Sequence, residues 1–259
     1  MDGRWNEVLD VGKSLAEDFR KTTGYIPSSD RGILPSEAFF ILVTSHPFRP
    51  VKIIESGRAQ GQSTFLLGKI FTDSKIISIE YDKDNPDAQI ALEKLAELTN
   101  VQCLFGNSME IIPKIFTDND ILVIDGPKDM KALMLTAIVS RRYKPRFVYI
   151  HDAYKGSILR NYLERSRFKC LYSDEPKFIQ SFCFLDESKD KKDIEFWSTP
   201  QNYPNDKIYG GTFACLETSS LRFSQVEMIK IAMVKLKYNL EMSFKKRFNQ
   251  GYQIKHPCE

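Results

Sequence analysis

The sequence has few of the features that mark secreted, membrane-spanning or disulfide-linked proteins. Its 259 residues include five cysteines, an odd number, and no Cys-x-x-Cys pair indicates a zinc or redox site. The longest apolar run, from Ala38 to Val43, is far shorter than the ~20 residues that a membrane-spanning helix needs. No apolar signal-peptide core follows Met1. We therefore expect a reduced, cytoplasmic protein with no membrane partner.

The sequence also lacks an excess of charge of either sign. It has 37 Lys and Arg residues against 34 Asp and Glu residues, so the net charge is only +3. Nucleic-acid-binding domains usually carry a strong basic excess, so the composition argues against a nucleic-acid partner. With 42% hydrophobic and 27% charged residues, the chain has the composition of a globular protein.

Short apolar runs alternate with helical patterns through residues 51–165. The runs lie at 51–54, 75–79, 101–105, 121–124 and 147–150, and the helical patterns between them at 63–70, 86–98, 109–116 and 129–142. Strands without polar alternation are typical of a sheet that is buried on both faces. The sequence therefore predicts an α/β fold, a Rossmann-like, doubly wound and mostly parallel sheet.

Different patterns flank this region, and we divide the chain into residues 1–50, 51–220 and 221–259. Helices are expected over 6–22 and 35–46, joined by a loop at 24–34, and packing against the main domain is favoured over a lid. Residues 178–185 and 211–216 are interpreted as an antiparallel pair at the sheet edge.

Residues 223–248 predict a long amphipathic helix with a basic face. It either docks with that face in solvent or forms a homodimer or anionic-surface contact.

Polar or glycine residues follow every predicted parallel strand. The segments are 55–64, 80–82, 106–108, 125–128 and 151–152. In open α/β sheets, ligands bind outside the carboxyl ends of the strands. We therefore expect these segments to surround one ligand.

The first of these turns has the pattern Glu55-x-Gly57-x-x-x-Gly61. A phosphate-binding P-loop needs four residues between its glycines and then Gly-Lys, but here three intervene and Gln62 stands in place of lysine. A dinucleotide-binding turn needs Gly-x-Gly-x-x-Gly, but Ala59 replaces its middle glycine. An acidic residue followed by spaced glycines suits a ligand that carries an ammonium group.

With this turn and its continuation Gly61-Gln62-Ser63-Thr64, residues 35–185 resemble class I S-adenosylmethionine-dependent methyltransferases, nearest to the small-molecule O-methyltransferases. The resemblance implies S-adenosylmethionine as cofactor, with Glu80 accepting both ribose hydroxyls and the segment at 106–108 bordering the adenine. The implied cofactor-binding residues are Glu55, Gly57, Ala59, Gly61, Ser63, Thr64, Glu80, Tyr81, Asn107, Ser108 and Asp125. Ala59 fits this role if its φ is negative.

Asp125 and Asp152 end neighbouring predicted strands and suggest two chemistries. Two carboxylates can bind Mg²⁺, as in the catechol-type enzymes that the chain resembles, although Ala153 stands where a third ligand is expected. Alternatively, His151 can deprotonate an acceptor hydroxyl, oriented by Asp125 or Asp152. Lys128 either holds an anionic acceptor or is solvated. The candidate catalytic residues are Asp125, Lys128, His151 and Asp152.

The expected activity is methylation of a hydroxyl on a small-molecule or sugar-like acceptor. Trp197, Tyr203 and Tyr209 are candidates for lining the acceptor pocket. The main alternative is a non-catalytic cofactor-binding or scaffold protein of the same fold. A nicotinamide-dependent oxidoreductase is disfavoured because the Gly-x-Gly-x-x-Gly pattern is missing.

Overall fold

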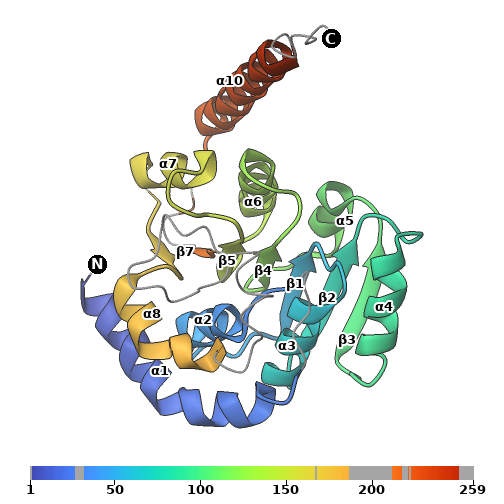
Figure 1. Ribbon diagram of the computed structural model, residues 1–259, viewed down its shortest axis with the longest axis vertical. Coiled ribbons are helices and arrows are strands. Elements are labelled where there is room, and N and C mark those ends of the chain that lie inside the picture. The colour runs from blue at the N-terminus through green and yellow to red at the C-terminus, as the bar shows by residue number, and fades with distance from the viewer. Residues whose placement is uncertain are drawn as a thin grey trace, which may run out of the picture.

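A computed structural model of the chain describes residues 2–26, 32–166, 168–186, 212–217, 221 and 223–250. These residues contain a seven-stranded sheet with the order β3-β2-β1-β4-β5-β7-β6 (Figure 1). The strands are β1 (Lys52–Ser56), β2 (Lys75–Glu80), β3 (Val101–Phe105), β4 (Ile121–Ile124), β5 (Phe147–Ile150), β6 (Cys170–Tyr172) and β7 (Ala214–Glu217).

Strands β1 to β5 run parallel to one another, whereas β7 runs antiparallel to both β5 and β6. The register aligns buried isoleucines, with Ile53 opposite Ile76 in β2 and Ile121 in β4. β4 and β5 are buried along their whole length, which explains their continuous apolar sequences. The predicted α/β fold class is confirmed, including its antiparallel edge.

Helices cover both faces of the sheet. They are α1 (Asp2–Thr23), α2 (Pro35–Ser45), α3 (Gln62–Ile70), α4 (Pro86–Leu95), α5 (Ser108–Ile115), α6 (Met130–Arg142), α7 (Ile158–Arg165), α8 (Pro176–Phe182) and α10 (Gln225–Gln250). One core lies between the sheet and α1, α2, α3 and α8, and a second lies between the sheet and α5, α6 and α7 (Figure 1). This arrangement leaves the carboxyl ends of β1 to β5 at one edge.

The predicted strand at 178–185 is wrong, because these residues form the end of α8 and a 3₁₀ turn at Cys183–Asp186. Pro176 occupies the first turn of α8, where its fixed φ is favourable. Phe178 and Phe182, four residues apart, face the same way and pack on Phe39 of α2. The strand that pairs with β7 is β6, a few residues earlier in the chain.

The N-terminal helices pack against the main domain. Ten of the eleven residues of α2 are buried, and α1 contributes Trp5 and Phe19 to the same core. The middle of the loop predicted at 24–34, residues 27–31, lies outside the described residues.

The C-terminal helix α10 confirms the predicted long helix. Its first turns contact α6, and the rest stands away from the body of the molecule (Figure 1). Among the described helices, none combines the length and the apolar character needed to cross a membrane.

Candidate functional site

The turn between β1 and α3 depends on two left-handed glycines. Gly57 has a φ of +89°, and a Cβ added there would lie 2.6 Å from the backbone nitrogen of Gly126. Gly61 has a φ of +80° and caps α3. Ala59 also lies in the left-handed region, with a φ of +43°. The condition set for Ala59, a negative φ, is therefore not met, and the turn contains a strained alanine.

Glu80, at the end of β2, holds this turn in place. Its Oε2 accepts the backbone N–H groups of Arg58 at 3.0 Å and Ala59 at 2.8 Å, and its Oε1 accepts that of Tyr81 at 2.8 Å. These three bonds offset the strain at Ala59. A carboxylate has about four acceptor sites, so Oε1 keeps room for one further donor.

A cavity of about 570 Å³ opens beside Glu80, within the usual range for small-molecule sites. Its wall consists of Gly57, Glu80, Tyr81, Asn107, Ser108, Met109, Gly126, Pro127, Lys131, Met134 and Lys235. Five of the predicted cofactor residues are among them. The side-chain oxygen of Asn107 accepts the Met109 N–H, so Asn107 also caps α5. Lys131 and Lys235 also line the cavity but were not predicted as site residues, and Lys235 belongs to α10.

Other predicted cofactor residues form a closed polar cluster below the turn. Glu55 is fully buried, and its Oε2 accepts the hydroxyls of Thr64 and Ser78. Burial raises the pKa of Glu55, and the hydroxyls of Ser63, Ser78 and Thr64 counter it in part. A carboxyl with a raised pKa is a poorer counter-ion, which weakens the predicted contact between Glu55 and an ammonium group.

A second, more open cluster follows β4 and β5. The Lys128 ammonium contacts Oδ1 of Asp125 and lies 2.7 Å from Oδ2 of Asp152. His151 Nδ1 lies 2.8 Å from Asp125 and 3.3 Å from Asp152, close enough for charge attraction although neither contact has hydrogen-bond geometry. The structure thus brings the four candidate catalytic residues together. Gly126 and Pro127, between Asp125 and Lys128 in the chain, place this cluster at the end of the cavity.

Glu37 of α2 belongs to the same cluster and was missed by the sequence analysis. Its Oε1 lies 3.0 Å from His151 Nε2, and its Oε2 accepts the Leu34 N–H at 2.7 Å. The side chain of Glu37 is 1% exposed. One signal was available in the sequence, because Glu37 is the single charged residue of the mostly apolar helix α2.

The charges of the cluster fix its protonation. Burial alone would lower the pKa of His151, but Asp125 and Glu37 outweigh it and raise that pKa well above its usual value. Burial would raise the pKa of Asp125, yet His151 and Lys128 hold it well below its usual value. The pKa of Lys128 is raised by Asp125 and Asp152 against the effect of burial. Burial also raises the pKa of Glu37, against the lowering effect of His151. The raised pKa of His151 favours its imidazolium form, whereas the predicted base needs the neutral imidazole.

The same geometry does not fit a divalent cation. Asp125, His151 and Asp152 have ligand atoms within 4.8 Å of one another. However, the ammonium of Lys128 already bridges the two carboxylates and takes the place that a cation would occupy between them. The predicted Mg²⁺ site at Asp125 and Asp152 therefore finds no support in the charge balance of this cluster.

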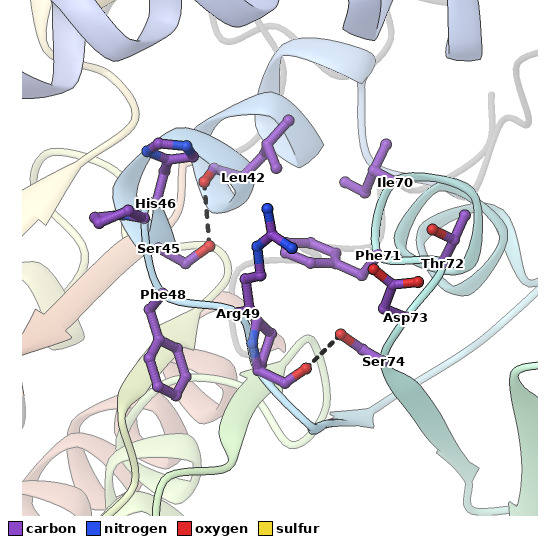
Figure 2. A pocket seen from close by; sticks show the side chains of 12 residues that line it. Leu42, Ser45, His46, Phe48, Arg49, Ile70, Phe71, Thr72, Asp73 and Ser74 are labelled. Atoms are coloured by element: carbon purple, nitrogen blue, oxygen red, sulfur yellow. Dashed lines mark hydrogen bonds between the residues drawn. The ribbon is translucent and has the colours of Figure 1, made fainter.

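A different cavity, of about 210 Å³, lies at the opposite edge, near the amino ends of β1 and β2. Figure 2 shows Arg49 extending into it, with Asp73 on the facing wall. No predicted site residue lines it. The candidate acceptor-pocket residues Trp197, Tyr203 and Tyr209 lie outside the described residues.

Comparison with protein families finds no match, and no curated protein matches either. Several solved structures are similar in fold. An O-methyltransferase from Bacillus cereus in complex with S-adenosylhomocysteine has 17% identity and a TM-score of 0.45, with 84% of this chain and 91% of that chain covered. TomG, an O-methyltransferase from Streptomyces achromogenes in complex with S-adenosylmethionine, has 18% identity and a TM-score of 0.44, with 82% and 89% covered.

Fibrillarin, in a complex with Nop5p, is also similar, with 12% identity and a TM-score of 0.46 over 73% of this chain and 81% of that chain. What the protein does has to be argued from its own site.

Proposed function

We propose that the protein is an S-adenosylmethionine-dependent methyltransferase that methylates a hydroxyl group of a small-molecule or sugar-like acceptor. One observation carries this proposal. A cavity walled by Gly57 and Glu80 ends at a cluster of paired charges, at the carboxyl edge of the sheet where ligands of such folds bind.

The cavity suits the nucleoside part of the cofactor. The remaining acceptor site on Glu80 Oε1 can take a ribose hydroxyl in a charge-assisted hydrogen bond. Gly57 and Gly126 leave their side of the wall without side chains, so a ligand can approach the backbone closely. Ser108 and Met109 line the neighbouring wall.

Lys128 and Asp152 suit the acceptor. The cofactor supplies an activated methyl group, so the chain has to orient the hydroxyl and receive its proton. A hydroxyl placed between Lys128 and Asp152 donates its proton toward the carboxylate, while the ammonium stabilises the oxyanion that develops. Asp152 is the more exposed carboxylate of the pair, at 39% against 27% for Asp125, so it can pass the proton to solvent.

Glu37, Asp125 and His151 position these two residues. The imidazolium of His151 lies between the Glu37 and Asp125 carboxylates, and Asp125 in turn contacts Lys128. This chain of alternating charges keeps the Lys128 ammonium near the acceptor position. The backbone of Asp152 is strained, with a φ of +60°, and such strain is common at functional sites.

The test is calorimetric binding of S-adenosylmethionine and S-adenosylhomocysteine to the wild type and to Glu80→Gln. We expect both ligands to bind the wild type and the substitution to weaken binding at least ~10-fold, because a charge-assisted contact becomes a neutral one. Asp84→Asn is the matched control, an exposed acid of the same loop that should bind as the wild type does. Melting curves establish whether the turn that Glu80 holds is intact.

NADH and NADPH are the informative competitors, because Lys131 and Lys235 in the cavity wall could also pair with phosphates. Binding of a nicotinamide nucleotide without S-adenosylmethionine would contradict the proposal. Binding of S-adenosylmethionine with no methyl transfer to any phenol, catechol or sugar would favour the scaffold alternative.

A further inference from the structure

Helix α10 exposes a stripe of large apolar side chains. Val226, Ile229, Met233, Leu236 and Leu240 are each 52–63% exposed. At 3.6 residues per turn these five side chains span an arc of about 80° around the helix axis, so they lie on one face. Among the described residues, no other helix carries so many exposed large apolar side chains.

The opposite face of α10 is the one that packs on the protein. Ile231 is fully buried in the core beside α6, and Met228 and Val234 pack against the same core. The stripe is therefore a second apolar face that α10 does not need for docking. Beyond these first turns, α10 stands clear of the body, so a partner helix has space beside it (Figure 1).

The stripe has the spacing of a coiled-coil seam. Its members follow one another at intervals of three, four, three and four residues, the a and d positions of two heptads. Such a seam is matched by another helix with the same spacing, and a second α10 has it.

The residues beside the seam select the orientation. Lys230 and Lys237 lie on one side, at e positions, and Gln225 and Ala232 lie on the other, at g positions. In a parallel pair each lysine faces an uncharged g residue of the other copy. In an antiparallel pair the lysines would face one another, which like charges disfavour.

We infer that α10 forms a parallel, two-stranded coiled coil with α10 of a second copy, and so makes the protein a homodimer. Two heptads bury little area, so the dimer is expected to dissociate reversibly on dilution. A lipid surface is the less suitable partner, because basic residues border the described stripe on one side alone.

Sedimentation equilibrium of the full chain over a range of concentrations tests this inference. The wild type should form a dimer, and Leu236→Glu should weaken it at least ~30-fold by placing a charge in the seam. Ile90→Glu is the matched control, since Ile90 is a 45% exposed apolar residue of α4 and should leave the dimer unchanged. Circular dichroism checks that both variants fold.

Orientation is tested by oxidising Leu236→Cys. In the parallel dimer the two copies of a d residue are adjacent, so this variant should form a covalent dimer faster than the wild type and than Ile90→Cys under the same conditions. A wild type that stays monomeric at all concentrations overturns the inference, whether or not it sediments with phosphatidylglycerol-containing vesicles. A dimer that Leu236→Glu does not weaken also overturns it.

Discussion

Two polar clusters lie at the carboxyl edge of the same sheet and differ in the groups that contact their carboxyl side chains. Below the first turn, Glu55 is fully buried and is met by hydroxyl groups, those of Thr64 and Ser78. After β4 and β5, Asp125 and Asp152 are partly exposed and share an ammonium, that of Lys128. Each cluster contains residues that sequence patterns assign to a site, Glu55 and Thr64 in the first and Asp125, Lys128 and Asp152 in the second.

This difference in burial and pairing distinguishes a carboxyl that supports the fold from a carboxylate that can contact a substrate. A carboxyl that is closed off and surrounded by neutral donors stabilises the turn that it lies beneath, but no ligand can reach it without rearrangement. A carboxylate that is paired with a cation and open to solvent can exchange that partner for a substrate group. Under the proposed function, access to solvent and to an exchangeable partner distinguishes the candidate catalytic carboxylates from the carboxyl that supports the turn.

Lys128→Met is the substitution expected to have the largest effect, and it acts on the open cluster. Removing the ammonium removes the group that stabilises the acceptor oxyanion, so turnover should fall by about 10²–10³-fold. Methyl transfer is measured with the acceptor that gives the highest rate in a screen of phenols and sugars. Affinity for S-adenosylmethionine should change less than about threefold, because Lys128 lies outside the cavity wall.

Lys155→Met, which removes an exposed lysine of the β5–α7 loop, should keep full turnover. Equal losses in the two variants, or an unchanged rate in Lys128→Met, would show that the Lys128 ammonium does not act on the acceptor. The open cluster would then be structural, like the closed one.

His151→Gln should have the next largest effect, and on stability. At pH 6 it leaves Glu37 and Asp125 without their shared cation, which should cost about 2 kcal/mol, reduced from the value for fully buried pairs because Asp125 is partly exposed. The pKa of His151 is raised in the folded state. Its contribution is therefore fully present below about pH 6.5 and is lost as the pH rises through the folded pKa.

The difference in free energy of unfolding between wild type and His151→Gln should accordingly narrow from pH 6 to pH 10, as measured by urea titration. His46→Gln, at an exposed histidine, should stay within about 0.5 kcal/mol of the wild type. A wild-type advantage that grows as the pH rises would mean that His151 is neutral in the folded protein, and it would restore His151 as a candidate base. A difference that does not depend on pH would mean that the pKa of His151 is the same in the folded and unfolded states.

Sequence patterns predicted the fold well where one physical signal dominates. Continuous apolar runs such as Ile121 to Ile124 locate strands, because burial on both faces leaves no polar position. The strand predicted from Phe178 to Leu185 was wrong because a short aromatic run fits a buried helical turn as well as a strand. The four-residue spacing of Phe178 and Phe182 fits a helix, and both rings contact Phe39 of α2, a contact that no local pattern reveals.

The site was less predictable because it depends on contacts distant in sequence. Glu37 and His151 are 114 residues apart, and no local pattern joins them. The predicted cofactor contact of Thr64 depends on distant contacts in the same way. The motif places Thr64 in the first turn of α3, but the path of the turn aims its hydroxyl at Glu55.

Thr64→Val should have the smallest of these effects and tests the closed cluster. Valine keeps the shape of threonine but removes one of the hydroxyls that Glu55 accepts, so the free energy of unfolding should fall by about 1 kcal/mol. Thr136→Val is the control, because Thr136 is equally buried but bonds to the carbonyl of Ala132 in its own helix. Affinity for S-adenosylmethionine should stay within about threefold in both variants. A large loss of affinity with unchanged stability would place the Thr64 hydroxyl against the cofactor and remove the distinction between the two clusters, since the closed one would then bind ligand as directly as the open one.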